Sequence, residues 1–144
     1  MKTSKIYFLA LALIAITATT FTSCKKGTDD PVISLKSRND RFTNTWTLTK
    51  YEKNGTTQSL DGTTYIFNVS SNGTLVRTVE GTLFGFATRS VENGTWEFLN
   101  DDEDVRITID SKASIYNIQR LASSELWLKE VIKDDTYFYY FTGK

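Results

Sequence analysis

The chain has 144 residues, with 17 basic and 17 acidic side chains and a formal net charge of zero at pH 7. Its length suits one domain, and its neutral balance offers neither a basic stripe for nucleic acid nor an acidic tail for a polycation. There is no histidine and one cysteine, Cys24. A Ser-His-Asp site, a Cys-His site and the usual zinc ligand sets are therefore excluded.

The amino end has the organisation of an export signal. Lys2 and Lys5 precede an apolar run over residues 6–16, and mostly small polar residues follow up to Ser23. This order is typical of a secretory signal peptide, and the run is shorter than the roughly 20 apolar residues that a spanning helix needs. We therefore expect residues 1–23 to be a signal peptide that is removed on export.

The motif Thr22-Ser23-Cys24 resembles the lipoprotein box of bacteria, in which the cysteine is lipidated and becomes the first residue. An unpaired thiol is a liability in an oxidising compartment, which favours modification of Cys24 over a stray cysteine after an ordinary signal. The resemblance implies palmitate-type acyl chains on Cys24 that hold the protein firmly at a bilayer. The expected location is the bacterial cell envelope, on the periplasmic or exposed side of the outer membrane.

Residues 24–42 lack strand or helix periodicity, and we predict a flexible tether with room for one short helical turn. The Asp29-Asp30 pair after Cys24 resembles the surface-export signals of Bacteroidota lipoproteins. From residue 43 to residue 144 the sequence becomes a succession of short β-branched and aromatic runs. We predict one domain there.

Four dipeptides that accept positive φ in hairpins divide this domain, namely Asn54-Gly55, Asp61-Gly62, Asn72-Gly73 and Asn93-Gly94. The predicted strands are residues 46–53, 64–70, 74–80, 84–91, 95–99, 104–110, 114–121, 125–132 and 136–142. Apolar residues alternate with polar ones along them, as at Val105, Ile107 and Ile109. The pattern predicts an all-β fold: a single antiparallel up-and-down meander of about eight or nine strands, closed into a barrel.

Several segments together resemble the lipocalin-like lipoproteins of the Bacteroidota. They are Trp46, Tyr65-Ile66-Phe67, Asn72-Gly73-Thr74-Leu75, Gly94-Thr95-Trp96-Glu97-Phe98 and residues 121–128, and the resemblance covers about residues 43–142. It implies a lipocalin-like barrel that binds a small hydrophobic or amphipathic ligand. The alternative is a non-catalytic envelope module whose filled barrel docks a protein or a glycan.

The barrel interior is the first candidate for a site. An eight-stranded barrel either fills itself with side chains or holds one small ligand, and aromatic bulk favours a mostly filled core with a shallow pocket as the alternative. The candidate ligand-binding residues are Trp46, Phe67, Phe84, Phe86, Trp96, Phe98, Arg120, Tyr137 and Tyr139. Phe84-Gly85-Phe86 is predicted to be a mobile apolar lip, or otherwise an ordinary strand with a glycine bulge.

Three arginines, Arg77, Arg89 and Arg120, lie in apolar strands, and one that points inward could hold a carboxylate. The acidic run over residues 100–104 could bind calcium, although a solvated hairpin tip explains it better because the EF-hand spacing and glycine are absent. No nucleophile or acid–base pair emerges, so we expect a protein that is not an enzyme, without cofactor or metal.

Overall fold

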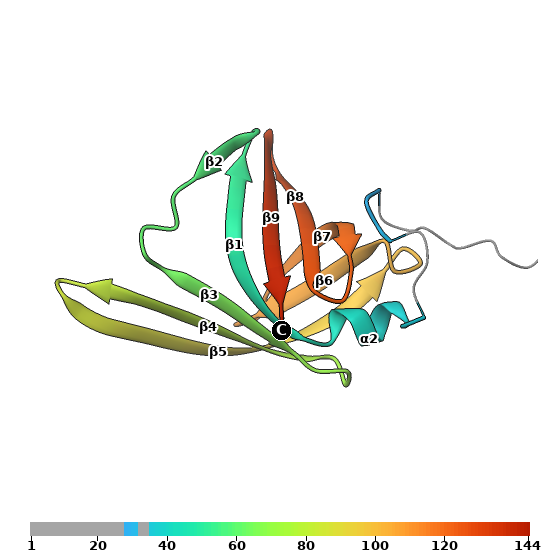
Figure 1. Ribbon diagram of the computed structural model, residues 1–144, viewed down its shortest axis with the longest axis horizontal. Helices are drawn as coiled ribbons and strands as arrows, with labels where there is room; N and C mark the ends of the chain where they lie inside the picture. The colour runs from blue at the N-terminus through green and yellow to red at the C-terminus, as the bar shows by residue number, and fades with distance from the viewer. Residues whose placement is uncertain (1–27, 32–34) are drawn as a thin grey trace, which may run out of the picture.

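The computed structural model describes residues 28–31 and 35–144 and shows one closed antiparallel sheet (Figure 1). Its elements are helix α2 (Arg38–Phe42) and strands β1 (Thr45–Lys53), β2 (Thr56–Gln58), β3 (Thr64–Val69), β4 (Thr74–Leu83), β5 (Phe86–Leu99), β6 (Asp104–Ile109), β7 (Lys112–Leu121), β8 (Glu125–Ile132) and β9 (Asp135–Gly143). Neighbouring strands pair in order from β3 to β9, and β1 pairs with both β3 and β9. The barrel therefore consists of β1 and β3–β9, with β2 as an extra strand, and the predicted all-β meander barrel is confirmed.

The core fills one end of this barrel. The predicted alternation places Val105 and Ile107 of β6 inside, where both are buried. Trp46 is fully buried, and its indole N–H donates to the carbonyl oxygen of Phe42 at 2.8 Å. The ring of Phe42 lies 4.7 Å from that of Trp96. Helix α2 thus contributes an aromatic side chain to the barrel core.

The segment before the barrel is part of the folded body. The backbone N–H of Asp29 donates to the carbonyl of Gln119 at 2.9 Å, and Arg41 donates to the carbonyl of Leu121 at 2.9 Å. Residues 28–31 and helix α2 are therefore tied to β7, and the packed body begins before the predicted domain start at residue 43. The predicted signal peptide and the lipidation site Cys24 lie outside the described residues. No helix among the described residues is long and apolar enough to span a membrane.

The structure corrects one predicted turn. Asn93-Gly94 lies inside β5, where the ladder with β4 continues through the pairs Val76↔Asn93 and Leu75↔Gly94. A Cβ atom on Gly94 would lie 2.4 Å from the carbonyl oxygen of Thr108, so glycine is needed there for close approach of β6. The predicted strands 84–91 and 95–99 are consequently a single strand.

The real turn of this hairpin lies at Phe84-Gly85, between the paired residues Leu83 and Phe86. Phe84 and Gly85 both have positive φ, of 51° and 83°. Phe84-Gly85 is thus a hairpin turn and Phe86 begins β5, so the segment is not an ordinary strand with a glycine bulge. Local residue patterns do not mark this turn, because phenylalanine is an unusual residue for it.

Candidate functional site: a pocket at the open end of the barrel

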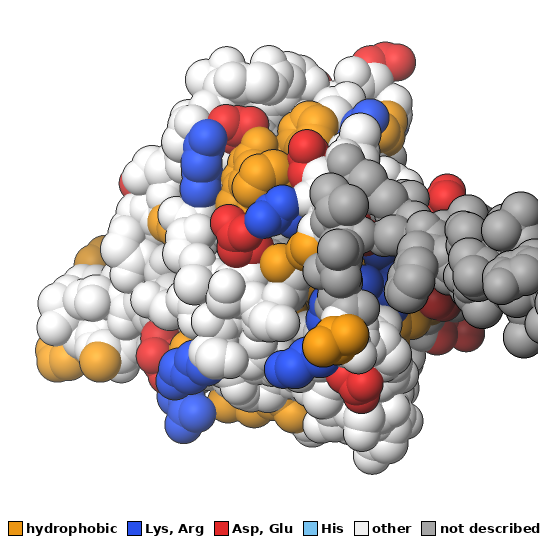
Figure 2. Space-filling model, turned by 45° about the vertical axis from the view of Figure 1, so that its right-hand side comes forward, with side chains coloured by type: hydrophobic (Ala, Val, Ile, Leu, Met, Phe, Trp, Pro, Cys, Tyr) orange, Lys and Arg blue, Asp and Glu red, His pale blue; other side chains and the backbone are white. Residues whose placement is uncertain are grey.

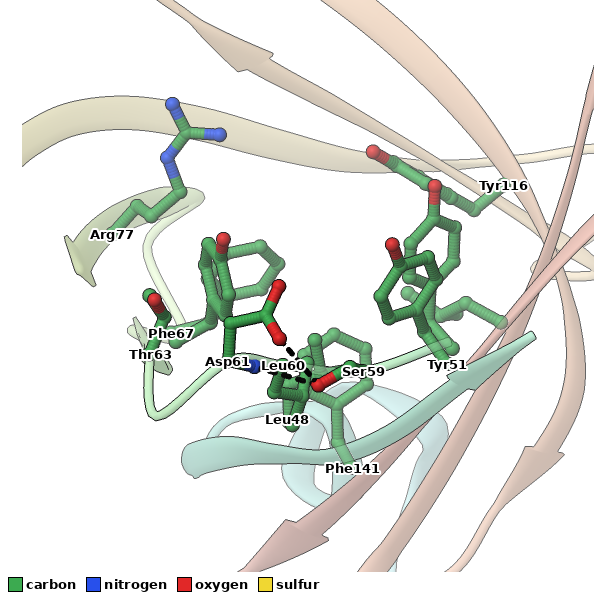
Figure 3. Close-up of a pocket in the computed structure, with 13 residues that line it drawn as sticks. Leu48, Tyr51, Ser59, Leu60, Asp61, Thr63, Phe67, Arg77, Tyr116 and Phe141 are labelled. Atoms are coloured by element: carbon green, nitrogen blue, oxygen red, sulfur yellow. Dashed lines mark hydrogen bonds between the residues drawn. The ribbon is translucent and has the colours of Figure 1, made fainter. Parts of the chain in front are cut away.

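The barrel opens where β1 separates from β3. These strands pair only over Thr45–Thr47, after which the end of β1 pairs with β2 instead. The connection over residues 59–63 then stands away from β1 and leaves a pocket of about 430 Å³ (Figure 3). The lining residues are Leu48, Tyr51, Ser59, Leu60, Asp61, Thr63, Tyr65, Phe67, Arg77, Tyr116, Leu128, Tyr139 and Phe141.

The floor of the pocket is apolar. Leu48, Leu128 and Phe141 are buried there, and the rings of Phe67 and Phe141 lie 5.4 Å apart. Leu48, Leu128 and Phe141 belong to the same buried core as Trp46, so the pocket ends in packed side chains. A small apolar group that entered would therefore contact apolar side chains.

Phenol rings form much of the wall above this floor. Tyr51 stacks on Tyr139 with ring centroids 6.2 Å apart, and Tyr116 meets Tyr139 edge-on at 5.8 Å. Figure 3 shows Tyr51 and Tyr116 on the side of the pocket opposite Arg77. Tyrosine combines a large apolar face with one hydroxyl group, so this wall suits a molecule that is partly apolar and partly polar.

The hydroxyls of Tyr116 and Tyr139 are held in their neutral form. The hydroxyl of Tyr139 donates to Glu130 at 3.1 Å. Burial raises the pKa of Tyr139, and the negative charge of Glu130 raises it further. The same two causes, burial first, raise the pKa of Tyr116. Both side chains therefore remain hydrogen-bonding phenols at neutral pH.

Arg77 is the cation of the pocket. It projects from β4 and forms an ion pair with Glu92, its partner across the ladder on β5. A second cavity of about 370 Å³ lies beyond it and shares Phe67, Arg77 and Tyr116 with the first. The Arg77–Glu92 pair thus stands where the two cavities meet, and its charges offset each other.

Only two of the predicted ligand-binding residues, Phe67 and Tyr139, line the larger cavity. Tyr137 lies on the same face of β9 as Tyr139 and stacks on it at 6.4 Å, but it does not line the cavity. The remaining predicted residues lie elsewhere: Trp46 and Trp96 are buried in the filled end, Phe98 packs against that core, and Phe84 and Phe86 are exposed at the β4–β5 hairpin.

Arg120 lies outside the barrel because β7 carries a register shift between Ile118 and Arg120. Strict alternation would have placed Arg120 on the same face as Ile118, whereas the extra residue puts Leu121 inside instead. The guanidinium of Arg120 binds Glu125, with one N–O distance of 2.7 Å, and lies over the ring of Trp127. Of the three candidate arginines, Arg77 lines the pocket, whereas Arg89 is exposed and pairs with Glu80.

Sequence reasoning missed Tyr51 and Leu60. A register shift between Leu48 and Lys50 on β1 turns Tyr51 toward the pocket, and no residue pattern marks that shift. Leu60 comes from the β2–β3 connection, beside the turn at Asp61 and Gly62. Leu60 could have been predicted to face inward, because an apolar side chain is unusual in a turn that is otherwise polar and solvated.

No metal site accompanies the pocket: within residues 28–31 and 35–144, no group of three or more His, Cys, Asp or Glu side chains is arranged to hold an ion. Residues 100–103 of the acidic run connect β5 to β6, and Asn100 donates to Asp104, the first residue of β6.

No family model and no curated protein matches the sequence. Among solved structures, the chain is similar to the odorant-binding protein from bovine nasal mucosa, with 11% identity, a TM-score of 0.46 and coverage of 78% of this chain and 77% of that one. It is also similar to a mutant of the fluorescent protein UnaG, with 11% identity, a TM-score of 0.42 and coverage of 72% and 96%. Likenesses at this level carry no argument about what this chain binds. The resemblance to lipocalin-like lipoproteins of the Bacteroidota stays a prediction.

Proposed function

We propose that the protein binds a small amphipathic molecule in the open end of its barrel. The observation that carries this proposal is the pocket of about 430 Å³, whose apolar floor lies below a wall of tyrosines and Arg77. This volume falls within the range of small-molecule sites, about 300–1,000 Å³. The proposed activity is binding, without a catalytic step.

The electrostatics favour a polar group without a large net charge at the mouth of the pocket. Glu92 neutralises Arg77, and the neutral phenols of Tyr116 and Tyr139 can donate or accept hydrogen bonds. The apolar part of the molecule would rest on Leu48 and the other floor residues. Oxygen-bearing head groups, such as hydroxyls or an ester, fit this wall better than a bare anion does.

Native mass spectrometry of the protein from its own cells tests the proposal directly, because a bound molecule would add its mass to the chain. A second test is titration with N-phenyl-1-naphthylamine, an uncharged apolar fluorophore. The variant Ser59→Trp puts an indole at the exposed rim of the pocket and should weaken binding about tenfold or more.

The matched control is Ser71→Trp, an exposed serine in the β3–β4 turn that does not line the pocket. It should bind the fluorophore as the parent chain does. No mass adduct, together with fluorophore binding that Ser59→Trp leaves unchanged, would contradict the proposal. That result would favour the alternative of a filled module that docks a protein or glycan.

We further propose that the protein works at a bacterial membrane, anchored through acyl chains on Cys24 after removal of residues 1–23. The motif Thr22-Ser23-Cys24 supports this proposal. The intact mass of the mature protein should then equal that of a chain starting at Cys24 plus its acyl groups. In cells, Cys24→Ser should move the protein from the membrane fraction to the soluble fraction, and an unchanged distribution would contradict the anchor.

A further inference from the structure

The far end of the β4–β5 hairpin extends beyond the rest of the sheet. β3 pairs with β4 only as far as Glu80, and β6 pairs with β5 only from Gly94 onward. Beyond these points the two strands have no third partner and project as a ribbon, at the lower left of Figure 1. Residues 82–91 are all exposed, so both faces of the ribbon meet solvent.

The end of this ribbon carries apolar side chains and no charge. Residues 81–88 contain no acidic or basic residue, and Leu83, Phe84 and Phe86 are 58%, 90% and 76% exposed. The first charged residues, Glu80 and Arg89, face each other across the ladder and form an ion pair at 3.3 Å. Figure 2 shows hydrophobic and uncharged side chains at the end of the projection on its left.

The backbone conformation of the turn indicates that phenylalanine at position 84 does not stabilise the fold. Phe84-Gly85 has φ values of 51° and 83°, and the β1–β2 turn Asn54-Gly55 has nearly the same values, 52° and 78°. Asparagine tolerates this conformation well, whereas a bulky phenylalanine is disfavoured. Because Phe84 is also the most exposed of the three side chains, no packing against the part of the chain that the structure describes compensates for that strain.

We propose that the hairpin tip, defined as Leu83, Phe84, Gly85 and Phe86, inserts into the interfacial layer of a lipid bilayer. From Gly81 to Phe84 the ribbon extends about 10 Å, at roughly 3.3 Å per residue. That length matches the depth of about 5–10 Å that interfacial segments reach. The open edges of a two-stranded ribbon carry unpaired backbone groups, which limits the tip to the interface and prevents deeper entry.

The order of side chains along the ribbon favours a bilayer over a protein partner. Protein interfaces surround an apolar centre with hydrogen-bonding groups. Here the apolar residues occupy the extremity, and the paired charges of Glu80 and Arg89 follow further back. Apolar side chains at the far end and charges at the level of the head groups are what the depth profile of a bilayer requires.

This contact is separate from the proposed anchor on Cys24, because the tip lies at the end of the long axis opposite to residues 28–31 (Figure 1). The test therefore uses the full chain with Cys24→Ser, in which Phe84→Cys supplies the one thiol for an NBD fluorophore. With vesicles of phosphatidylcholine, the NBD emission should shift to the blue and increase several-fold, and nitroxide lipids labelled near the head group should quench it.

The matched control is Ser71→Cys, also in the Cys24→Ser chain, because Ser71 is exposed at the opposite end of β4. Its NBD signal should not change with vesicles. A probe at residue 84 that stays in water, or equal changes at both positions, would overturn the proposal.

A second measurement removes the apolar tip altogether. The triple variant Leu83→Ser, Phe84→Asn, Phe86→Ser, in the Cys24→Ser chain, should partition into the same vesicles at least tenfold less than the Cys24→Ser parent. Both chains keep residues 1–23, so the difference reports on the tip. Asparagine suits the positive φ of this turn, so the melting temperature should not fall. Equal partitioning by the two chains would also overturn the proposal.

Discussion

Asp30 and Arg38 form a buried ion pair that ties the segment before the barrel to strand β7. The carboxylate of Asp30 accepts from the guanidinium of Arg38 and also from the backbone N–H of Leu121, the latter at 2.6 Å. The side chains of both charged residues are at least nine-tenths buried, at 3% and 7% exposed. Two further nitrogen atoms of Arg38, Nε and Nη2, have no hydrogen-bond partner among the described residues.

This geometry predicts that Asp30→Asn destabilises the protein by about 3 kcal/mol, because it leaves the buried charge of Arg38 uncompensated. Chemical denaturation should show the loss as a lower midpoint. The double variant Asp30→Asn, Arg38→Met should recover much of it, because the uncompensated charge is then gone. Losses that simply add in the double variant would show that the two side chains are not coupled.

Gly94 is predicted to be intolerant of any side chain. In Gly94→Ala, the new Cβ atom would meet the carbonyl oxygen of Thr108 at 2.4 Å and a side-chain carbon of Ile109 at 2.9 Å. Because the backbone of β6 cannot move without distorting its ladder, we expect a loss of about 2–3 kcal/mol in the free energy of unfolding.

The control for this prediction is Gly81→Ala on β4, where the nearest atom is the side-chain oxygen of Thr63 at 3.4 Å. It should cost well under about 1 kcal/mol, the size of an ordinary surface substitution. If both alanine variants lost the same free energy of unfolding, close approach of β6 would not be the reason for glycine at position 94.

Alkaline pH should destabilise the fold through the pocket tyrosines. The pKa of Tyr139 is raised by burial and by Glu130, so above pH of about 10 the unfolded state loses a proton that the folded state still holds. Stability is then fully present below the unfolded pKa and falls as the pH rises above it. Denaturation midpoints at pH 8 and pH 11 should differ.

In Tyr139→Phe the fall in stability between these pH values should be smaller, because one raised phenol is missing. Absorbance at 295 nm gives an independent check: the late phenolate step of the folded parent should be smaller in the variant, because Tyr116 still contributes to it. A variant with the full alkaline loss and the same late step would show that Tyr139 does not titrate as its surroundings require.

The Arg77–Glu92 pair should set the charge preference of the pocket. Arg77→Gln leaves the carboxylate of Glu92 and should weaken binding of the anionic fluorophore 8-anilinonaphthalene-1-sulfonate by about tenfold. Glu92→Gln leaves the guanidinium and should strengthen it by a similar factor.

Uncharged N-phenyl-1-naphthylamine serves as the comparison for both variants. Its affinity should change by no more than about threefold in either, because no charge of the ligand is involved. Anionic and uncharged fluorophores that respond alike would indicate that Arg77 and Glu92 act on the shape of the pocket.

Alternation of residues such as Val105 and Ile107 was enough to predict most of the strands and the up-and-down barrel, because side chains with a period of two bury one face of a sheet. It did not show that β5 continues through Asn93-Gly94. The composition likewise excluded histidine-based chemistry. The sequence also marked Cys24, through the residues before it, as the predicted lipidation site.

The pocket was decided only by the tertiary structure. Register shifts turn Tyr51 inward and Arg120 outward, and the separation of β1 from β3 opens the wall. Asn93-Gly94 is a second example of a feature that local patterns do not predict. The dipeptide is typical of a turn, but Gly94 is needed in the middle of β5 because the backbone of Thr108 lies close to it. Such features depend on which strands meet across the barrel, and local residue patterns do not determine those contacts.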